Sequence, residues 1–415
     1  MEKNVGVYIH IPFCSGKCAY CDFYSVVGKD KLMSEYHSAL LQHIKEYSPQ
    51  LDGYLIDTVY FGGGTPSHFG ATRLAGIFNE LKKQGNVLVD SEVTAEVNPE
   101  SVTKEELVKL RRAGFNRLSI GVQSANDTML KNLERRHSFA EAENAVLNAR
   151  AAGFQNISID LIYGLPSQSK DDWADTLNRA LAMKPEHVSC YGLKIEEGTP
   201  LYIFRDSPFV PDEDTQADMY MYAVETLSRF GLRQYEISNF ARRGFESQHN
   251  LKYWLGGEYL GLGPSAHSHI GGIRFSCIED VEKYTENIFA GKSVIDQYED
   301  ISDFEKAGEY LMLRLRTTRG ISESEYKSIF RCSLDMVLEL FEKYREMGFA
   351  YQKEDRWIFT TQGFMVSNVL IGEILDAHTN QRAHIATPWQ SVTTGENNQI
   401  SFFKNKRKVQ IFNGE

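Results

Sequence analysis

The sequence lacks any apolar run long enough to cross a membrane, and its first residues, Met-Glu-Lys-Asn, do not form a signal peptide. We therefore expect a cytoplasmic protein. Positive charge is also in deficit: 45 Lys and Arg residues face 56 Asp and Glu residues, which gives a net charge of -11. This balance argues against nucleic acid as the partner. Cysteine is scarce, and Cys190, Cys277 and Cys332 are too scattered to form a disulfide framework.

The other three cysteines, Cys14, Cys18 and Cys21, follow an apolar stretch at residues 5–11 that predicts a buried strand. Gly16 helps the chain to bend there, so that the thiols can converge. Three thiolates suit a soft metal or an iron–sulfur cluster with one iron open to a small molecule. A structural zinc site would need a fourth nearby ligand, and none follows at that spacing. Inert buried cysteines are the alternative, which the Ser-Gly-Lys loop between the first two disfavours.

Strand-like and helix-like segments alternate from residue 5 to about residue 236. The predicted strands are at 5–11, 58–61, 92–97, 117–122, 156–162 and 187–195, and the predicted helices are at 34–47, 74–83, 104–113, 140–151 and 171–182. Such a series predicts an α/β fold with parallel strands and crossover helices, either an open wound sheet or a partial barrel of six units. In these folds the chemistry lies at the C-terminal ends of the strands.

Three further regions follow the core at residues 1–236. One further strand is possible at 231–237, where the alternation fades. We assign 237–300 to a connecting region, 301–377 to a C-terminal module, and 378–415 to a polar, disordered tail. Within the module, helical patterns precede a predicted hairpin at 349–352 and 356–360. This order is typical of a winged-helix-like α+β module. Because the chain is acidic, we expect this module to act as a lid or partner platform and not to bind DNA.

Polar residues occur where the apolar strands end. Residues 62–66, Gly-Gly-Gly-Thr-Pro, end the second strand, and their glycines would let a ligand approach exposed backbone N–H groups. This loop is neither a P-loop nor a dinucleotide fingerprint. Glu96, Gln123 and Asp160 hold corresponding positions on the next three strands, so together they favour one shared polar ligand. Taken singly, each is equally well explained as a hydrogen-bonded core residue, and the loop as a tight turn.

The spacing Cys-x3-Cys-x2-Cys after a first strand resembles the signature of the radical S-adenosylmethionine (SAM) superfamily. In that superfamily SAM chelates the open iron of a [4Fe–4S] cluster, and reduction yields a 5′-deoxyadenosyl radical. Residues 8–14, 61–66, 121–124 and 160–166 further resemble the oxygen-independent coproporphyrinogen oxidase family, over roughly residues 1–375. The resemblance implies a partial (β/α)6 TIM-like radical SAM barrel with Cys14, Cys18 and Cys21 on the cluster. It also implies SAM contacts at Tyr8, Tyr20, Gly63, Gly64, Thr65, Glu96, Gln123, Arg135 (with Arg136 beside it) and Asp160.

Two departures separate this chain from the oxidases of that family. The oxidases carry a cysteine two residues after the third ligand, where this chain has Phe23, and they have an extension before the first strand. In their place, residues 249–254, His-Asn-Leu-Lys-Tyr-Trp, resemble the HNxxYW motif of the family's heme chaperone branch. This resemblance implies a protein that binds heme, a [4Fe–4S] cluster and SAM. It would transfer heme from a donor to acceptor proteins such as respiratory hemoproteins, some of them membrane-associated, without coproporphyrinogen dehydrogenase activity.

The heme motif is physically reasonable. A neutral imidazole is the commonest heme-iron ligand, so His249 is the candidate axial ligand. On a helix Tyr253 would share its face, and the rings of Tyr253 and Trp254 would offer a flat surface to a porphyrin. The alternative is that these residues pack a lid against the barrel. His267 and His269 are secondary candidates for heme binding.

Two other functions compete with the chaperone. One is oxidative decarboxylation of coproporphyrinogen III by the adenosyl radical. The other is a redox carrier whose cluster only shuttles electrons, which the glycine loop and the polar strand ends disfavour, because a carrier needs no small-molecule site. An open side of a partial barrel would also permit a homodimer.

Overall fold

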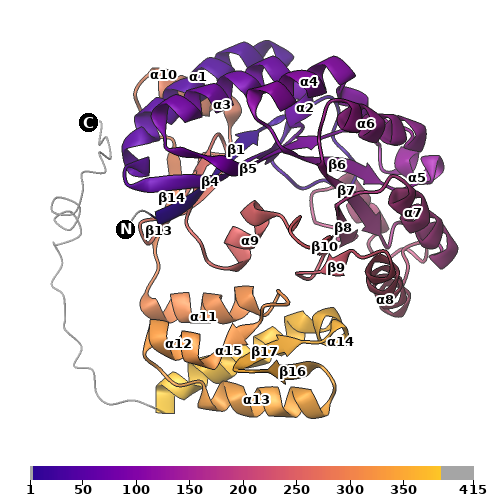
Figure 1. The fold of residues 1–415 in the computed structure, drawn as a ribbon, viewed down its shortest axis with the longest axis vertical. Helices are drawn as coiled ribbons and strands as arrows, with labels where there is room; N and C mark the ends of the chain where they lie inside the picture. The colour runs from indigo at the N-terminus through magenta and orange to yellow at the C-terminus, as the bar shows by residue number, and fades with distance from the viewer. Residues whose placement is uncertain (1–2, 385–415) are drawn as a thin grey trace.

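Six parallel strands form the centre of a 12-stranded sheet and are neighbours in the order in which they occur in the chain (Figure 1). The computed structural model describes residues 3–384. The six strands are β1 (Lys3–Ile11), β4 (Tyr54–Gly63), β5 (Val87–Val97), β6 (Arg117–Gln123), β7 (Asn156–Tyr163) and β8 (His187–Gly192). The predicted series of six parallel strands is therefore confirmed.

The crossover helices cover the outer face of this sheet (Figure 1). They are α1 (Met33–Tyr47), α3 (Ala71–Gln84), α4 (Lys104–Ala113), α6 (Phe139–Ala151), α7 (Lys170–Ala182) and α8 (Glu213–Arg229), with short α2 (Pro66–Phe69) and α5 (Asp127–Asn132) and 3-10 turns at Asp30–Leu32, Ser48–Leu51, Pro99–Ser101 and Pro200–Phe204. The start of α4 illustrates the local sequence control, because Thr103 and Glu106 form a complete capping box. Gly114 ends the same helix with a left-handed φ of 114°.

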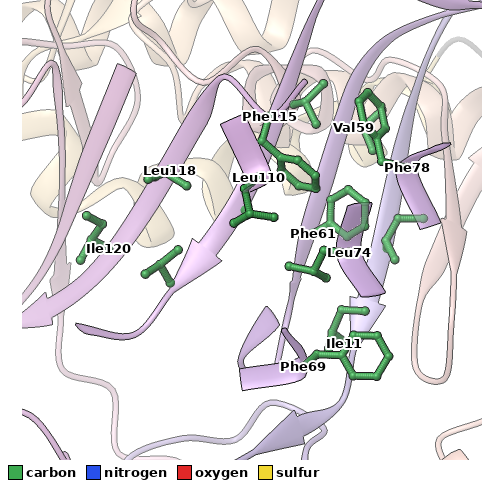
Figure 2. Close-up of a cluster of buried hydrophobic side chains, with 14 of the residues drawn as sticks. Ile11, Val59, Phe61, Phe69, Leu74, Phe78, Leu110, Phe115, Leu118 and Ile120 are labelled. Atoms are coloured by element: carbon green, nitrogen blue, oxygen red, sulfur yellow. The ribbon is translucent and has the colours of Figure 1, made fainter. Parts of the chain in front are cut away.

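The core between strands and helices is apolar and closely packed. Figure 2 shows Val59 and Phe61 of β4 beside Leu74 and Phe78 of α3, with Phe115 among them. The rings of Phe61 and Phe115 have centroids 5.0 Å apart, and all five side chains are buried. Burial of such side chains contributes about 1.5–3 kcal/mol each, which holds the strand ends in fixed positions.

Further strands extend both edges of the central sheet. β11 (Tyr259–Leu262) pairs in parallel with β1, and antiparallel β12 (His267–Ile270), β13 (Ile273–Cys277) and β14 (Ile295–Asp300) follow it outward, with α10 (Val281–Phe289) between the last two. On the other edge, β10 (Asn239–Ala241) pairs antiparallel with β8, and β9 (Arg233–Gln234) pairs antiparallel with β10. Residues that the sequence assigned to a connecting region, 237–300, thus continue the sheet of the core. The possible strand at 231–237 is limited to β9.

The C-terminal module lies beside the barrel and has its own core (Figure 1). Its order is α11 (Asp303–Arg314), β15 (Ile321–Ser322), α12 (Glu323–Phe330), α13 (Asp335–Glu346), β16 (Ala350–Lys353), β17 (Arg356–Phe359), α14 (Thr361–Met365) and α15 (Ser367–His384). The first three of these five helices and the three-stranded sheet follow the order of the predicted winged-helix-like arrangement, and α14 and α15 come after it.

The predicted disordered tail was expected to begin at residue 378, but α15 continues past that boundary to His384. The rest of the predicted tail, 385–415, lies outside the described residues. Within residues 3–384, none of the helices combines the length and the apolar character that a bilayer span requires.

Candidate functional site: a cavity at the strand ends

A cavity of about 490 Å³ lies against the ends of the central strands. The structure brings the three predicted cluster cysteines and most of the predicted SAM residues onto its wall, namely Cys14, Cys18, Cys21, Tyr20, Gly63, Gly64, Thr65, Glu96, Gln123, Arg135 and Asp160. Tyr8 is the exception among the predicted SAM contacts, since it is absent from this lining. Its hydroxyl lies 3.2 Å from Nδ1 of His10, and its ring lies beside that of Tyr60.

The cysteine loop leaves β1 and is fixed by a short parallel pair, β2 (Phe13–Cys14) with β3 (Val26–Val27). Two of the thiols accept hydrogen bonds from the cavity wall. Thr65 Oγ1 donates to Cys14 Sγ over 3.4 Å, and Arg135 Nη1 donates to Cys18 Sγ over 3.5 Å. Such donors stabilise negative charge on sulfur, as cluster ligation requires.

The chemistry of the three thiols fits a cluster better than a single ion. Burial raises the pKa of Cys21 to about 11, and the charges of Cys18 and Cys14 add to the shift. Three neighbouring thiolates therefore need positive charge between them, which the irons of a cluster supply. Among residues 3–384, no three His, Cys, Asp or Glu side chains are placed to hold one metal ion.

The glycine loop at the end of β4 is tied to the cysteine loop by its backbone. Gly64 N donates to the Ile11 carbonyl and Thr65 N to the Phe13 carbonyl, each over 2.8 Å. A Cβ on Gly64 would lie 2.9 Å from both carbonyl oxygens. The sequence predicted that this loop offers its N–H groups to a ligand. At these two positions the N–H groups instead hold the cysteine loop in place.

Glu96 and Asp160 present carboxylates to the cavity in different environments. Tyr60 donates a 2.8 Å hydrogen bond to Glu96, yet burial still raises the pKa of Glu96 to about 7. Asp160 accepts hydrogen bonds from three serines over 2.7–3.1 Å: Ser119, Ser158 and Ser189. Burial raises the pKa of Asp160 despite these bonds. Glu96 can therefore hold a proton near neutral pH, while the carboxylate of Asp160 accepts more hydrogen bonds from the protein.

Gln123 and Arg135 sit where β6 departs from regular geometry. Gln123 has a left-handed φ of 65°, and the pairing of β6 with β7 shifts register just before it. Arg135 Nη2 donates to Asn98 Oδ1 over 2.9 Å and to the Gly121 carbonyl over 2.8 Å. Of the two neighbouring arginines, Arg135 is the one on the cavity wall, and Arg136 lies against Gly16 of the cysteine loop.

The predicted heme motif forms α9 (Gln248–Trp254), a short helix enclosed by the curved sheet (Figure 1). His249 is buried and both of its ring nitrogens are engaged, Nδ1 with Thr58 Oγ1 at 2.9 Å and Nε2 with the Tyr253 hydroxyl at 2.8 Å. Its ring stacks on Tyr60 with centroids 5.2 Å apart. Burial lowers the pKa of His249 to about 3, so the imidazole is neutral. The shared face of His249 and Tyr253 is confirmed.

The rest of the motif is divided between cavity and surroundings. His249, Tyr253 and Trp254 do not line the cavity, whereas Asn250 does. The arrangement matches the packing alternative, because the amides of Gln248 and His249 donate to the Glu92 carboxylate over 3.0 Å and hold α9 against β5. His267 and His269 are on β12, between β11 and β13, and are likewise absent from the lining.

Sequence reasoning missed several residues of the wall, including Tyr60, Asn98, Arg117, Ser119, Ser189 and Asn250. A signal for two of them was present in β6. Arg117 and Ser119 alternate there with Leu118, Ile120 and Val122, which is the period of a strand with one polar face. Because β6 is buried along its whole length, that polar face has to point into the barrel.

Comparison with known proteins agrees with this geometry. The Radical SAM superfamily matches residues 8–180. The heme chaperone HemW of Bacillus subtilis is 33% identical over 374 residues, which cover 89% of this chain and 98% of that protein. The chain belongs to the HemW family. HemW of Escherichia coli is 31% identical over 368 residues, covering 88% of this chain and 97% of that protein.

The fold is also shared with a solved enzyme structure. Coproporphyrinogen III oxidase (HemN) from Escherichia coli, described as a radical SAM enzyme, superimposes with a TM-score of 0.79 at 23% identity, over 91% of this chain and 90% of the oxidase. The radical SAM fold predicted from the sequence is thereby confirmed. Membership of the radical SAM superfamily implies a [4Fe–4S] cluster and SAM, and the cavity wall described above has the thiols and polar groups to hold both.

Proposed function

We propose that this protein is a heme chaperone that binds a [4Fe–4S] cluster and SAM in the cavity, binds heme, and transfers heme to acceptor proteins. The observation that carries the proposal is similarity to proteins named heme chaperone HemW over about nine tenths of the chain. Cys14, Cys18 and Cys21 would hold the cluster, and Glu96, Gln123, Arg135 and Asp160 would orient SAM. When bound, the cluster and SAM supply the chemistry of a 5′-deoxyadenosyl radical.

His249 remains our proposed heme ligand, with a condition that its contacts impose. A neutral imidazole is required for ligation, and His249 is neutral. Its Nε2 is occupied by the Tyr253 hydroxyl, so iron can approach only after that hydroxyl has moved away. Trp254, which is partly exposed at the end of α9, would then face the porphyrin. Heme binding at this motif therefore includes a rearrangement of α9.

A transfer assay tests the proposal. The cluster-loaded protein would be charged anaerobically with hemin and mixed with an apo-hemoprotein, and the Soret band of the acceptor would be followed. We expect faster acceptor filling than with free hemin at the same concentration. A parallel incubation with coproporphyrinogen III, SAM and a reductant should give no protoporphyrinogen. Steady protoporphyrinogen formation without heme transfer would establish the oxidase alternative instead.

The setting of this function is part of the proposal. Acceptors would be respiratory hemoproteins, some of them membrane-associated, and a donor protein would supply the heme. We propose that the protein acts in the cytoplasm. Because its net charge is negative, we do not expect it to bind nucleic acid. The winged-helix-like module would serve as the platform for a partner or a second copy.

A further inference from the structure

Arg117 is a buried cation on the cavity wall that the proposed SAM and heme sites do not use. It is the first residue of β6, so it lies at the strand-start end of the cavity, whereas the cysteines follow the far end of β1. Its side chain is only 1% exposed. Neither Nε nor Nη1 has a hydrogen-bond partner in the part of the chain that the structure describes. A buried guanidinium with unused donors is an uncommon and destabilising arrangement.

Arg135 provides the contrast within the same cavity. Its Nη atoms donate to Cys18 Sγ, Asn98 Oδ1 and the Gly121 carbonyl. Arg135 is thus bound by the protein, whereas the fork of Arg117 is left open. Among the described residues Arg135 leaves only Nε without a partner, whereas Arg117 leaves both Nε and Nη1 without one.

The acids near Arg117 keep it charged but direct their oxygens elsewhere. Glu92 is the largest of the influences that hold the pKa of Arg117 above its ordinary value against the effect of burial. Both oxygens of Glu92 accept from the first amides of α9, at Gln248 and His249. Asp160 accepts from Ser119, Ser158 and Ser189. Glu96, which also feels the charge of Arg117, accepts from Tyr60. The guanidinium therefore stays protonated with donors available to a ligand.

We propose that Arg117 binds a carboxylate of the ligand that occupies the cavity. A planar fork of N–H donors matches the two oxygens of a carboxylate, and a partly desolvated site strengthens the pairing. Two ligands of the proposed function carry this group: SAM has a methionyl carboxylate and heme has two propionates. We expect the propionates to be the source, because SAM that chelates the cluster would have its methionyl end beside the cysteines, away from Arg117. The heme source rests on the proposed function, whereas the SAM source rests only on membership of the radical SAM superfamily.

Matched ligand pairs test the proposal by calorimetry and optical titration on the anaerobic, cluster-loaded protein. One pair is SAM and decarboxylated SAM, and the other is hemin and hemin dimethyl ester. For each pair, the affinity for the ligand with the carboxylate is divided by the affinity for the ligand without it. This ratio is measured in the wild type and in Arg117→Gln, and the two values are compared. We expect the ratio to fall about 10-fold to 100-fold in one pair, as for loss of a charge-assisted hydrogen bond. The pair that changes identifies the source of the carboxylate.

Using a ratio makes the test insensitive to a general loss of stability in Arg117→Gln. Arg117→Lys, which keeps the charge without the fork, should lose part of the preference. Arg111→Gln removes the same charge from the exposed end of α4 and should leave both ratios unchanged. If both ratios in Arg117→Gln equal those of the wild type, the proposal is overturned. The free N–H groups of Arg117 would then bind buried water. If wild type binds no hemin, the proposed function fails, and the SAM pair alone decides the role of Arg117.

Discussion

The Tyr60 hydroxyl on β4 lies 2.8 Å from Oε1 of Glu96 on the neighbouring strand and donates a hydrogen bond to it. This bond favours the ionised carboxylate, but burial outweighs it and the pKa of Glu96 is raised to about 7. In the unfolded chain a glutamate titrates at about 4.3. The folded protein therefore retains this proton over a pH range in which the unfolded chain has lost it.

The first prediction follows from that difference in proton binding. Between pH of about 4 and about 7 the folded state binds more protons at Glu96, so the free energy of unfolding falls as the pH rises. Glu96→Gln removes the titrating group, and unfolding of the cluster-free protein in urea should depend less on pH between pH 5 and 8 than in the wild type. An unchanged pH dependence would contradict the raised pKa of Glu96.

Glu236 provides a matched control for this experiment. It is buried outside the cavity lining, and burial raises its pKa to about 7 as well. Glu236→Gln should flatten the pH dependence of unfolding in the same direction. Only Glu96→Gln should also weaken SAM binding, because only Glu96 faces the cavity.

The second prediction concerns the cluster. Cys14→Ala, Cys18→Ala and Cys21→Ala should each reduce the iron and sulfide content of the reconstituted protein to near zero, since two thiolates do not retain a cubane. Cys332→Ala, at an exposed cysteine of the C-terminal module, is the control and should keep a full cluster. Measured iron, sulfide and the brown chromophore decide the matter. A full cluster after loss of any of the first three thiols would show that the assignment of ligands is wrong.

A third prediction separates packing from ligand contact at Gly64. Because its Cβ would press on the carbonyl oxygens of Ile11 and Phe13, Gly64→Ala should displace the cysteine loop and lower cluster content. We expect a loss of about 2 kcal/mol in unfolding free energy, as for other overpacked sites. Gly372→Ala, in α15 with open space around the glycine, should instead stabilise the helix by about 1 kcal/mol. Normal cluster content in Gly64→Ala would remove the proposed coupling between the two loops.

The fourth prediction tests His249 as a heme ligand. His249→Ala should weaken hemin binding and shift the Soret band. Tyr253→Phe keeps the aromatic contact but releases Nε2, so hemin affinity should rise by up to about 10-fold, the equivalent of one hydrogen bond. Thr58→Val releases only Nδ1 and serves as the control. If Tyr253→Phe binds hemin no better than wild type, α9 has a packing role and the iron is bound elsewhere.

The parts of the fold that sequence could predict are those with strong local patterns. The central strands are apolar runs and the crossover helices carry caps such as Thr103 and Gly114, so each element is encoded within its own residues. Strands β11–β14 were missed because they are short and their pairing is not local. β11 pairs with β1 at the opposite end of the core sequence.

The site was predictable where it follows strand ends and less so inside the barrel. Strand ends of a parallel sheet meet at one edge, which is why Glu96, Gln123 and Asp160 could be grouped from sequence. The burial of His249 could not be predicted from the sequence. Helical spacing identifies its partner Tyr253, but its other partner, Thr58, comes from β4. Tyr8 was assigned from family resemblance alone. Its hydroxyl lies 3.2 Å from His10 Nδ1 and its ring lies beside that of Tyr60, and its contact with SAM stays a prediction.

The pairing of β1 with β11 has a consequence for how the protein is made. One edge of β1 finds its partner when residue 63 leaves the ribosome, but the other edge waits until residue 262 has been synthesised. During that interval the strand that leads into the cysteine loop has unpaired backbone groups, which is a hazard for misassembly. The same interval leaves that side of the sheet uncovered until β11 and the strands beyond it are added. Iron delivered to the nascent chain would meet its three thiols before β11 is in place.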